Sequence, residues 1–425
     1  MENTTQQLNS PTALLTLDHI EPFIQLHDSH VSGKFRDIQL NSAFQPIFSL
    51  AHRRAVGFEA LLRPQAADGS SLSPLAVFDM AQGETENVFL DRLCRIVHTR
   101  NFLAQGDDIN WLFLNISPMV TVYGKRHGPF FADVMDRYQI PPHRVVIEIL
   151  EEKIQDEGLL AEAVMYFKEL GCLVAIDDFG AGHSNFDRIW RIQPHIVKLD
   201  RSIITQAAIN PSVRRVIPNL VNLIHEAGSL ALMEGVETEE EALISIDSDV
   251  DFVQGYYFAK PAKILPPSHL SRSSIDELCK KSILANKDES ITYKNKLHTY
   301  LDAFQIFLQQ FKDGMEAGAA CQGFLSQPKA ERCYLLDQDG KQLGSNFSSI
   351  SSPSLDPRFN PLADSRDALW ARRHYFRRAI NKPGEIQVSR PYLSITGGNM
   401  CVTLSVAVLK GKEAVVLCGD LMWND

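Results

Sequence analysis

The chain has 425 residues, of which 44% are hydrophobic and 22% charged, so it is long enough for two or three globular domains and unlike a disordered or fibrous protein. Its 42 lysines and arginines against 52 aspartates and glutamates give a net charge of -10. That balance argues against broad binding to DNA, which needs a basic surface, but it leaves room for a small phosphate ligand held through metal ions.

The N-terminal residues 1–17 are polar, are expected to be loose, and lack the basic and apolar regions of a signal peptide. No run of 18 apolar residues follows, so the sequence predicts no transmembrane segment and a cytoplasmic location. The seven cysteines are scattered without a Cys-x-x-Cys pair, which favours free thiols in a reducing compartment over a zinc site.

The predicted elements begin with a short amphipathic helix within residues 18–30. From about residue 40 to residue 262, strand-like and helix-like segments alternate, and the clearest helices cover 86–103, 158–170 and 212–227. Such alternation is typical of parallel strands in an α/β fold, so we expect residues 18–262 to form one β/α barrel.

Polar side chains close six of the apolar β runs in this region. They are Glu59 in GFEALLR, Asn115 in WLFLNIS, Glu148 in RVVIEIL, Asp177 and Asp178 in LVAIDDFG, Lys198 in IVKLD, and Glu234 in LALMEGVE. In a β/α barrel the strand ends meet at one mouth, where the chemistry takes place. A single acid there can simply cap the next helix. Six such positions together favour a divalent-metal site for a phosphate ester, because carboxylate and amide oxygens suit Mg²⁺ or Mn²⁺ better than zinc.

The composition changes after residue 262. Residues 263–325 are expected to hold a linker, rich in proline, serine and lysine up to about 290, and then one long amphipathic helix over 291–322. That helix could pack on its own C-terminal domain or also pair with a second copy in a homodimer.

Residues 326–425 read as a small α+β domain. The segment 332–346 is typical of two strands joined at an Asp-Gly turn, and residues 401–423 of two strands joined at 410–412. Between these pairs, residues 364–381 are expected to form a basic helix.

Seven motifs in residues 40–262 resemble, in order and spacing, those of the EAL family of cyclic-di-GMP phosphodiesterases. They are GFEALLRP, LNIS, IEILEE, AIDDFGAGHSN, VKLD, EGVET and QGYYFAKP. The resemblance implies a TIM-like (β/α)8 barrel that uses two Mg²⁺ or Mn²⁺ ions to hydrolyse cyclic-di-GMP to linear 5′-pGpG. No GGDEF-like motif occurs, so no cyclase activity is expected.

The resemblance also implies roles for the matching residues. The ligands of a first metal are matched by Glu59, Asn115, Glu148 and Asp177, and those of a second metal and its waters by Asp177, Asp178 and Glu234. Lys198 matches the lysine that holds or polarises the attacking water, with Glu237 behind it, so the catalytic set is Lys198, Glu237 and Glu59. Contacts to the dinucleotide, or to a water near it, are matched by Gln45, Arg63 and Gln254.

The loop after Asp178 departs from the family pattern. His183 stands where the family more often has a tyrosine, while Glu151 matches the glutamate that anchors this loop. Leu150 and Met233 replace a commoner threonine and alanine. None of these changes removes a ligand, so they put regulation in question more than chemistry.

The C-terminal residues YLLDQDGKQLGSN and RPYLSITGGNMCVTLSVAV resemble the PAS-like or Cache-like domain behind the EAL domain of YkuI-type proteins. This implies a sensor or dimerisation module, with Arg390, Tyr392 and Thr396 as candidate contacts to an unknown small-molecule signal. A packing domain without a ligand is the alternative. For the whole chain, the alternative to a hydrolase is a receptor that binds cyclic-di-GMP without cutting it and signals through the long helix.

Overall fold

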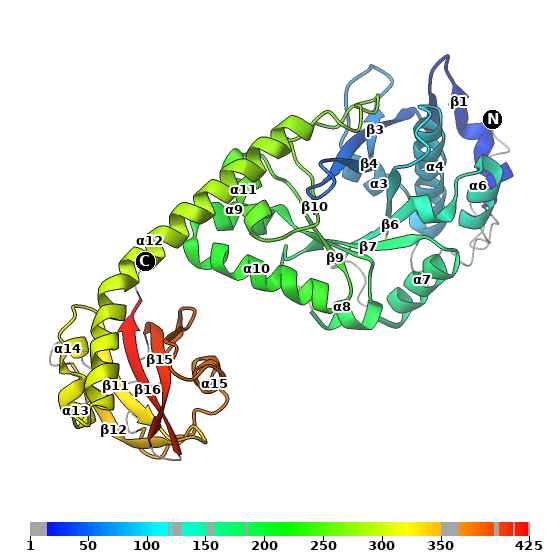
Figure 1. Cartoon of the computed structure of the whole chain (residues 1–425). Helices are drawn as coiled ribbons and strands as arrows, with labels where there is room; N and C mark the ends of the chain where they lie inside the picture. Colours follow the sequence, from blue (N-terminus) through cyan, green and yellow to red (C-terminus); the bar gives the residue numbers. More distant parts are fainter. Residues whose placement is uncertain are drawn as a thin grey trace. The chain divides into compact units, whose positions relative to one another are not determined.

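The computed structural model describes residues 15–117, 120, 130–150, 157–182, 186–349, 365–394, 399–410 and 413–423 (Figure 1). The chain divides into two compact units, residues 1–285 and 286–425. Each unit has its own hydrophobic core among the described residues.

Eight strands of the first unit close into a barrel with helices outside it (Figure 1). Their order is β3-β10-β9-β8-β7-β6-β5-β4, and pairing of β3 with β4 closes the ring. The strands are β3 (Ile38–Ser49), β4 (Arg54–Gln65), β5 (Trp111–Ile116), β6 (Val145–Leu150), β7 (Leu173–Phe179), β8 (Ile196–Leu199), β9 (Leu230–Met233) and β10 (Phe252–Val253). The predicted TIM-like barrel is confirmed.

One strand departs from the expected parallel arrangement. β3 is antiparallel to both of its barrel neighbours, β4 and β10. Only residues 50–53 separate β3 from β4, which is too short for a crossover helix, so the two strands form a hairpin. The other neighbouring pairs in the barrel are parallel.

Helices cover the outside of the barrel. The predicted helices 86–103, 158–170 and 212–227 correspond to α4 (Gly83–Leu103), α7 (Glu157–Glu169) and α10 (Pro211–Glu226). The other described helices around the barrel are α3 (Pro74–Asp79), α6 (Phe131–Tyr138), α8 (Phe186–Ile192), α9 (Arg201–Ile209) and α11 (Glu239–Asp247).

The prediction of a helix within residues 18–30 is mostly wrong. Only α2 (Leu17–Ile20) and a 3-10 turn, Glu21–Phe23, form there, and a hairpin of β1 (Ile24–Leu26) and β2 (Val31–Phe35) follows.

The long helix α12 (Arg272–Lys312) begins well before the predicted start at residue 291, so the linker expected up to 290 is wrong over most of its length. No proline lies between Pro267 and Pro328, and nothing therefore stops a helix from starting at 272. The helix ends before Gly314, whose φ of 93° lies in the left-handed region, so it does not reach 322. Ile275 and Leu278 belong to the core of the first unit, and Phe304 and Phe307 to that of the second. Homodimerisation stays a prediction.

The second unit is built on a sheet whose described strand pairs are all antiparallel, in the order β12-β11-β16-β15-β13, with β14 also paired to β15. Both predicted strand pairs are confirmed, as β11 (Ala330–Leu336) with β12 (Gln342–Ser348) and β15 (Met400–Lys410) with β16 (Glu413–Met422). The short strands are β13 (Gln387–Val388) and β14 (Tyr392–Leu393), and the short helices are α13 (Ala317–Ala320) and α14 (Gln322–Leu325). The predicted helix 364–381 is shorter, as α15 (His374–Asn381), because residues 365–373 form turns with Asp367 at a φ of 60°.

All seven cysteines are free thiols. In the part of the chain that the structure describes, no helix combines the length and hydropathy needed to cross a membrane.

Candidate metal centre at the barrel mouth

The strand alternation places the predicted polar residues in one row inside the barrel. An apolar layer of Phe113, Val146, Ala175, Ile196, Leu232 and Phe252 fills the interior, one residue from each of β5 to β10. Two positions further along the chain from these residues stand Asn115, Glu148, Asp177, Lys198, Glu234 and Gln254, the last two directly after the ends of β9 and β10. Since side chains two apart on a strand point to the same face, the polar row lies directly above the apolar layer.

The hairpin strands add Glu59 and Gln45 to this row. Glu59 lies two positions after Gly57 on β4, and Gln45 is paired with Glu59 on β3. A Cβ at Gly57 would lie only 2.5 Å from the ring of Phe113 and would collide with it, so glycine lets that ring fill the apolar layer.

The ammonium of Lys198 lies among four carboxylates and is almost fully buried. Its Nζ is 2.5 Å from Glu148 Oε1, 2.6 Å from Glu234 Oε1, 2.9 Å from Asp177 Oδ1 and 3.8 Å from Glu59 Oε2. Burial alone would lower the pKa of Lys198, but these carboxylates outweigh it and raise the pKa well above its usual value. The lysine is therefore a fixed positive charge at the centre of the row.

Glu59 is held by two side-chain amides. Asn115 Nδ2 donates to its Oε1 at 2.9 Å, and Gln254 Nε2 donates to its Oε2 at 2.7 Å. Burial opposes ionisation, yet Lys198 and these two hydrogen bonds outweigh burial and lower the pKa of Glu59. Glu59 is thus kept ionised and oriented.

Three other acids at the barrel mouth, two in the row and Asp178 next to it, are hard to ionise in the protein alone. Burial and the charge of Glu59 raise the pKa of Glu148 well above its usual value. Burial and Asp177 raise the pKa of Glu234 to about 8 and that of Asp178 to about 6. Five carboxylates against one ammonium give a formal charge of −4, which two divalent cations would neutralise.

The donor set fits such cations. One oxygen from each of Asp177, Asp178 and Glu234 lies within 4.8 Å of the others. Asp178 has a φ of 58°, a left-handed conformation that is uncommon for a residue other than glycine and is often found at functional sites. The buried oxygens of Glu148 and Oε1 of Gln254 lack a hydrogen bond of normal geometry, although Lys198 forms a close ion pair with Glu148. Buried oxygen atoms that lack a hydrogen-bond donor are suitable ligands for a hard cation.

Not every predicted site residue contacts this cluster. Glu237 pairs with Arg201 Nη2 at 2.7 Å rather than with Lys198. A capping box, in which Thr238 caps α11 and Glu241 accepts from the backbone N–H groups of Glu237 and Thr238, fixes this turn. Arg63 lines a cavity beside Asn115, and Gln45 Nε2 donates to the carbonyl of Ala259 at 3.4 Å. Glu151 and His183 lie outside the described residues.

A buried pair on α4 supports the site and was missed in the sequence. Asp91 is ion-paired with Arg95, and Asp91 Oδ1 accepts from the backbone N–H of Ser117 at 2.8 Å. This bond anchors the chain two residues after Asn115. The only signal in the sequence was an acid and an arginine at i and i+4, a spacing that is also common on exposed helices.

The sequence of the chain is similar to those of several known proteins. The EAL domain family model matches residues 29–261, more than half of the chain. The chain is 24% identical over 384 residues to the uncharacterized EAL-domain containing protein YkuI of Bacillus subtilis, which covers 85% of this chain and 90% of that protein. It is 28% identical over 236 residues to the cyclic di-GMP phosphodiesterase RocR of Pseudomonas aeruginosa, covering 54% of this chain and 59% of RocR.

Other relatives are much longer than the shared region. The chain is 27% identical to the signaling protein YkoW of Bacillus subtilis over 241 residues, 55% of this chain and only 29% of YkoW. Among solved structures, YkuI in complex with the substrate c-di-GMP and calcium matches with a TM-score of 0.77 at 22% identity, over 91% of this chain and 97% of that one. That likeness shows a shared fold that extends beyond the barrel.

Proposed function

The chain belongs to the EAL domain family, and from this premise we propose that it is a metal-dependent phosphodiesterase that hydrolyses cyclic-di-GMP to linear 5′-pGpG. The observation that carries the proposal is the complete row of oxygen ligands around the buried Lys198. RocR, a cyclic di-GMP phosphodiesterase by name, and YkuI, solved with that nucleotide, give the substrate class.

Two groups of residues would hold the metals, taken as Mg²⁺ or Mn²⁺. Glu59, Asn115, Glu148 and Asp177 form the first, and Asp177, Asp178 and Glu234 form the second. Bound there, divalent cations would lower the pKa of a water molecule and stabilise charge on the phosphate oxygens. The charge of −4 that the residues leave uncompensated is the physical reason to expect two of them.

The residues then orient and stabilise the reacting atoms. Lys198 Nζ donates hydrogen bonds and places a positive charge where the water becomes hydroxide, and it need not act as a base. Glu59, fixed by Asn115 and Gln254, keeps the ligands on β4 and β5 in place. Gln45 and Arg63 are proposed to contact the nucleotide. Glu237 is proposed to act behind Lys198, which requires it to leave Arg201.

The reaction balances without a covalent protein intermediate. The water oxygen bonds to one phosphorus of the ring, and the bond from that phosphorus to the 3′ oxygen breaks. One hydrogen of the water ends on the new 3′-hydroxyl, and the other leaves as the new 5′-phosphate ionises. The product is the linear dinucleotide.

The test is to incubate the full chain with cyclic-di-GMP and Mn²⁺, Mg²⁺ or EDTA, and to separate the nucleotides by chromatography. We expect metal-dependent pGpG, reduced by about 100-fold or more in Glu59→Gln, since that change removes a charged ligand. The matched control is Glu240→Gln, because Glu240 is exposed and pairs with Arg214 away from the row.

Tight binding of intact cyclic-di-GMP after hours with Mn²⁺ would reject the hydrolase and make the chain a receptor. Equal activity of Glu59→Gln and Glu240→Gln would show that another site makes the product.

A further inference from the structure

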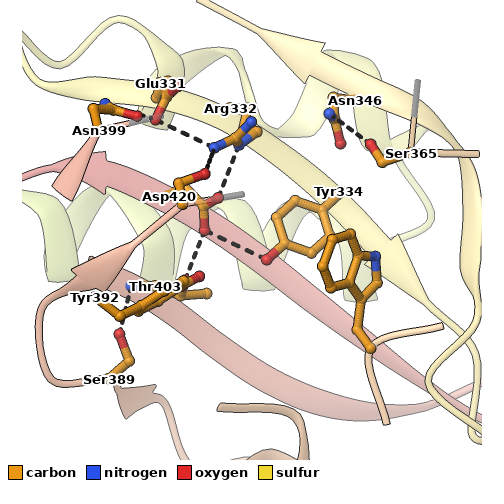
Figure 2. A network of polar contacts seen from close by, with 12 residues as sticks. Glu331, Arg332, Tyr334, Asn346, Ser365, Ser389, Tyr392, Asn399, Thr403 and Asp420 are labelled. Atoms are coloured by element: carbon orange, nitrogen blue, oxygen red, sulfur yellow. Dashed lines mark hydrogen bonds and ion pairs between the residues drawn. The ribbon is translucent and has the colours of Figure 1, made fainter. Parts of the chain in front are cut away.

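The C-terminal sheet carries a buried charged network on one of its faces. Arg332 on β11 and Thr403 on β15 are both paired in register with Asp420 on β16, so three polar side chains stand side by side on adjacent strands (Figure 2). The side chains of Arg332 and Asp420 are only 6% and 4% exposed. A buried ion pair is costly to desolvate, so its presence calls for a role other than stability.

Asp420 is fully engaged within this network. Its Oδ2 accepts from Arg332 Nε at 2.8 Å, and its Oδ1 accepts from Thr403 at 2.7 Å and Tyr334 at 3.4 Å (Figure 2). Tyr392 extends the chain of contacts through a hydrogen bond of 2.7 Å between its hydroxyl and that of Thr403. Asp420 therefore serves to hold Arg332 in place and has little capacity left for a ligand.

Arg332 keeps donor capacity. Its Nη2 donates to Ser394 at 2.5 Å and to Glu331 at 3.5 Å. Within the described ranges its other terminal nitrogen, Nη1, has no hydrogen-bond partner. A rigidly held guanidinium with spare donors is a typical partner of a carboxylate.

A narrow cavity borders this guanidinium. It is lined by Arg332, Tyr334, Gln342, Asn346, Ser365, Trp370, Arg373, Tyr375, Tyr392, Ser394 and Asp420. The empty space within and in front of this lining is about 290 Å³ including open solvent, so the enclosed part is smaller still. The space suits a ligand of few atoms, well below the size of a nucleotide.

A second arginine completes the cavity wall. The guanidinium of Arg373 lies 6.0 Å from the ring centre of Trp370 and 5.6 Å from that of Tyr392. Trp370 is itself fixed by a hydrogen bond of 2.9 Å to Gln342. Among the residues that the structure describes, no carboxylate is paired with Arg373. Asp420 and Glu331 together offset the charge of Arg332, so the attraction of the cavity for an anion comes from the guanidinium of Arg373 and the remaining donors of Arg332.

We propose that this cavity binds a small organic carboxylate, held between Arg373 and the free edge of Arg332 and packed against Trp370 and Tyr392. The site goes beyond the proposed hydrolase and gives the C-terminal unit a ligand of its own. Of the three contacts expected from the sequence, Tyr392 lines this cavity, whereas Arg390 is exposed and Thr396 lies outside the described residues.

The test is calorimetric titration of the full chain with acetate, lactate and benzoate, with acetamide as a neutral molecule of the same shape as acetate. We expect at least one carboxylate to bind saturably and acetamide not to bind. Arg373→Gln should weaken that binding by about tenfold or more, the usual loss for a charged hydrogen bond. Arg373 makes no side-chain capping bond to α15, so this variant should fold. The matched control is Arg378→Gln, which removes the same charge from an exposed position of α15 and should bind normally.

Three outcomes would overturn the proposal. They are no saturable binding of any carboxylate at millimolar concentration, equal weakening by Arg373→Gln and Arg378→Gln, or tighter binding of inorganic phosphate than of every carboxylate tested. Fluorescence of Trp370, compared with a Trp370→Phe variant, gives an independent readout in the cavity itself.

Discussion

Lys198 makes the acidic row compatible with folding. Four carboxylates within 3.8 Å of one ammonium would repel each other strongly if the lysine were absent, and burial would add several kcal/mol for each uncompensated charge. One lysine cannot neutralise the site completely, because its single positive charge faces five carboxylates. The row is therefore stable enough to fold and still acidic enough to attract divalent cations.

At the residue scale, the buried histidine His98 should make the stability of the fold depend on pH. Burial and nearby Arg63 lower the pKa of His98 to about 4, and its Nδ1 is hydrogen-bonded to Ser42 at 2.8 Å. The unfolded chain takes up this proton near pH 6.5, but the folded protein takes it up only near pH 4. Stability from this group is therefore complete above pH 6.5 and is lost as the pH falls towards 4, by about 3 kcal/mol at most.

Urea unfolding of wild type and His98→Gln between pH 7 and pH 4 checks this. The variant should lose less stability over that range than the wild type, while His269→Gln, a change at an exposed histidine, should follow the wild type. Parallel curves for all three proteins would mean that His98 does not stay neutral in the fold.

At the scale of elements, hydrophobic period and strand ends predicted most of the barrel and identified nearly all of the polar side chains that the structure brings together at its mouth. The strand pattern was easy to recognise, because each strand is apolar and stops on a polar residue. Once one face of a strand is buried, its pairing register is also fixed, since a slip by one residue would turn the apolar side chains to the other face. The direction of β3 was not visible, since it depends on the short turn at 50–53 and not on the pattern within the strand. The pairing of Glu237 with Arg201 depends on side-chain reach between a loop and a helix, which spacing does not encode.

The same reasoning found the long strands of the C-terminal unit but misjudged the ends of α12 and the start of α15. α12 starts early because serine, aspartate and lysine at 272–290 are tolerated in a helix, although they resemble a linker in composition. The buried network around Arg332 could not be predicted, because charged residues on a strand usually face solvent.

At the scale of elements, we predict the effect of adding a side chain at Gly255, which lies directly against the backbone of Val236. A Cβ at this position would lie 2.0 Å from the carbonyl oxygen of Val236, while Val236 donates to Gln254 and accepts from Tyr257. Gly255→Ala must therefore move the backbone that carries Gln254, which holds Glu59. We expect a loss of about 1–3 kcal/mol in the free energy of unfolding, and weaker Mn²⁺ binding.

Gly323→Ala is the matched control, because nothing lies within 4 Å of its Cβ position and it sits in helix α14. Chemical unfolding and metal titration of both variants measure the effect. If Gly255→Ala were as stable as Gly323→Ala, the close approach to Val236 would not hold in solution.

At the scale of the whole molecule, the chain has separate cores for separate tasks. The core around the barrel and the core around Phe304, Phe307 and Phe324 share no residue, and the EAL family match ends at residue 261. The acidic row belongs to the first unit and the charged cavity to the second. The two proposals therefore assign one ligand site to each unit.

The last prediction is that the two units unfold in separate transitions. Phe304 is fully buried and packs edge-on against Phe307 and Phe324, while Phe102 is fully buried beside Phe44 and Phe58 in the first unit. Because truncating a buried phenylalanine costs about 3–5 kcal/mol, Phe304→Ala and Phe102→Ala should each lower one calorimetric transition by roughly ten degrees and leave the other in place. Scanning calorimetry of the full chain with EDTA measures both. A single transition that moves with either substitution would instead show that the two cores melt as one cooperative unit, so that a ligand bound to either unit would stabilise both.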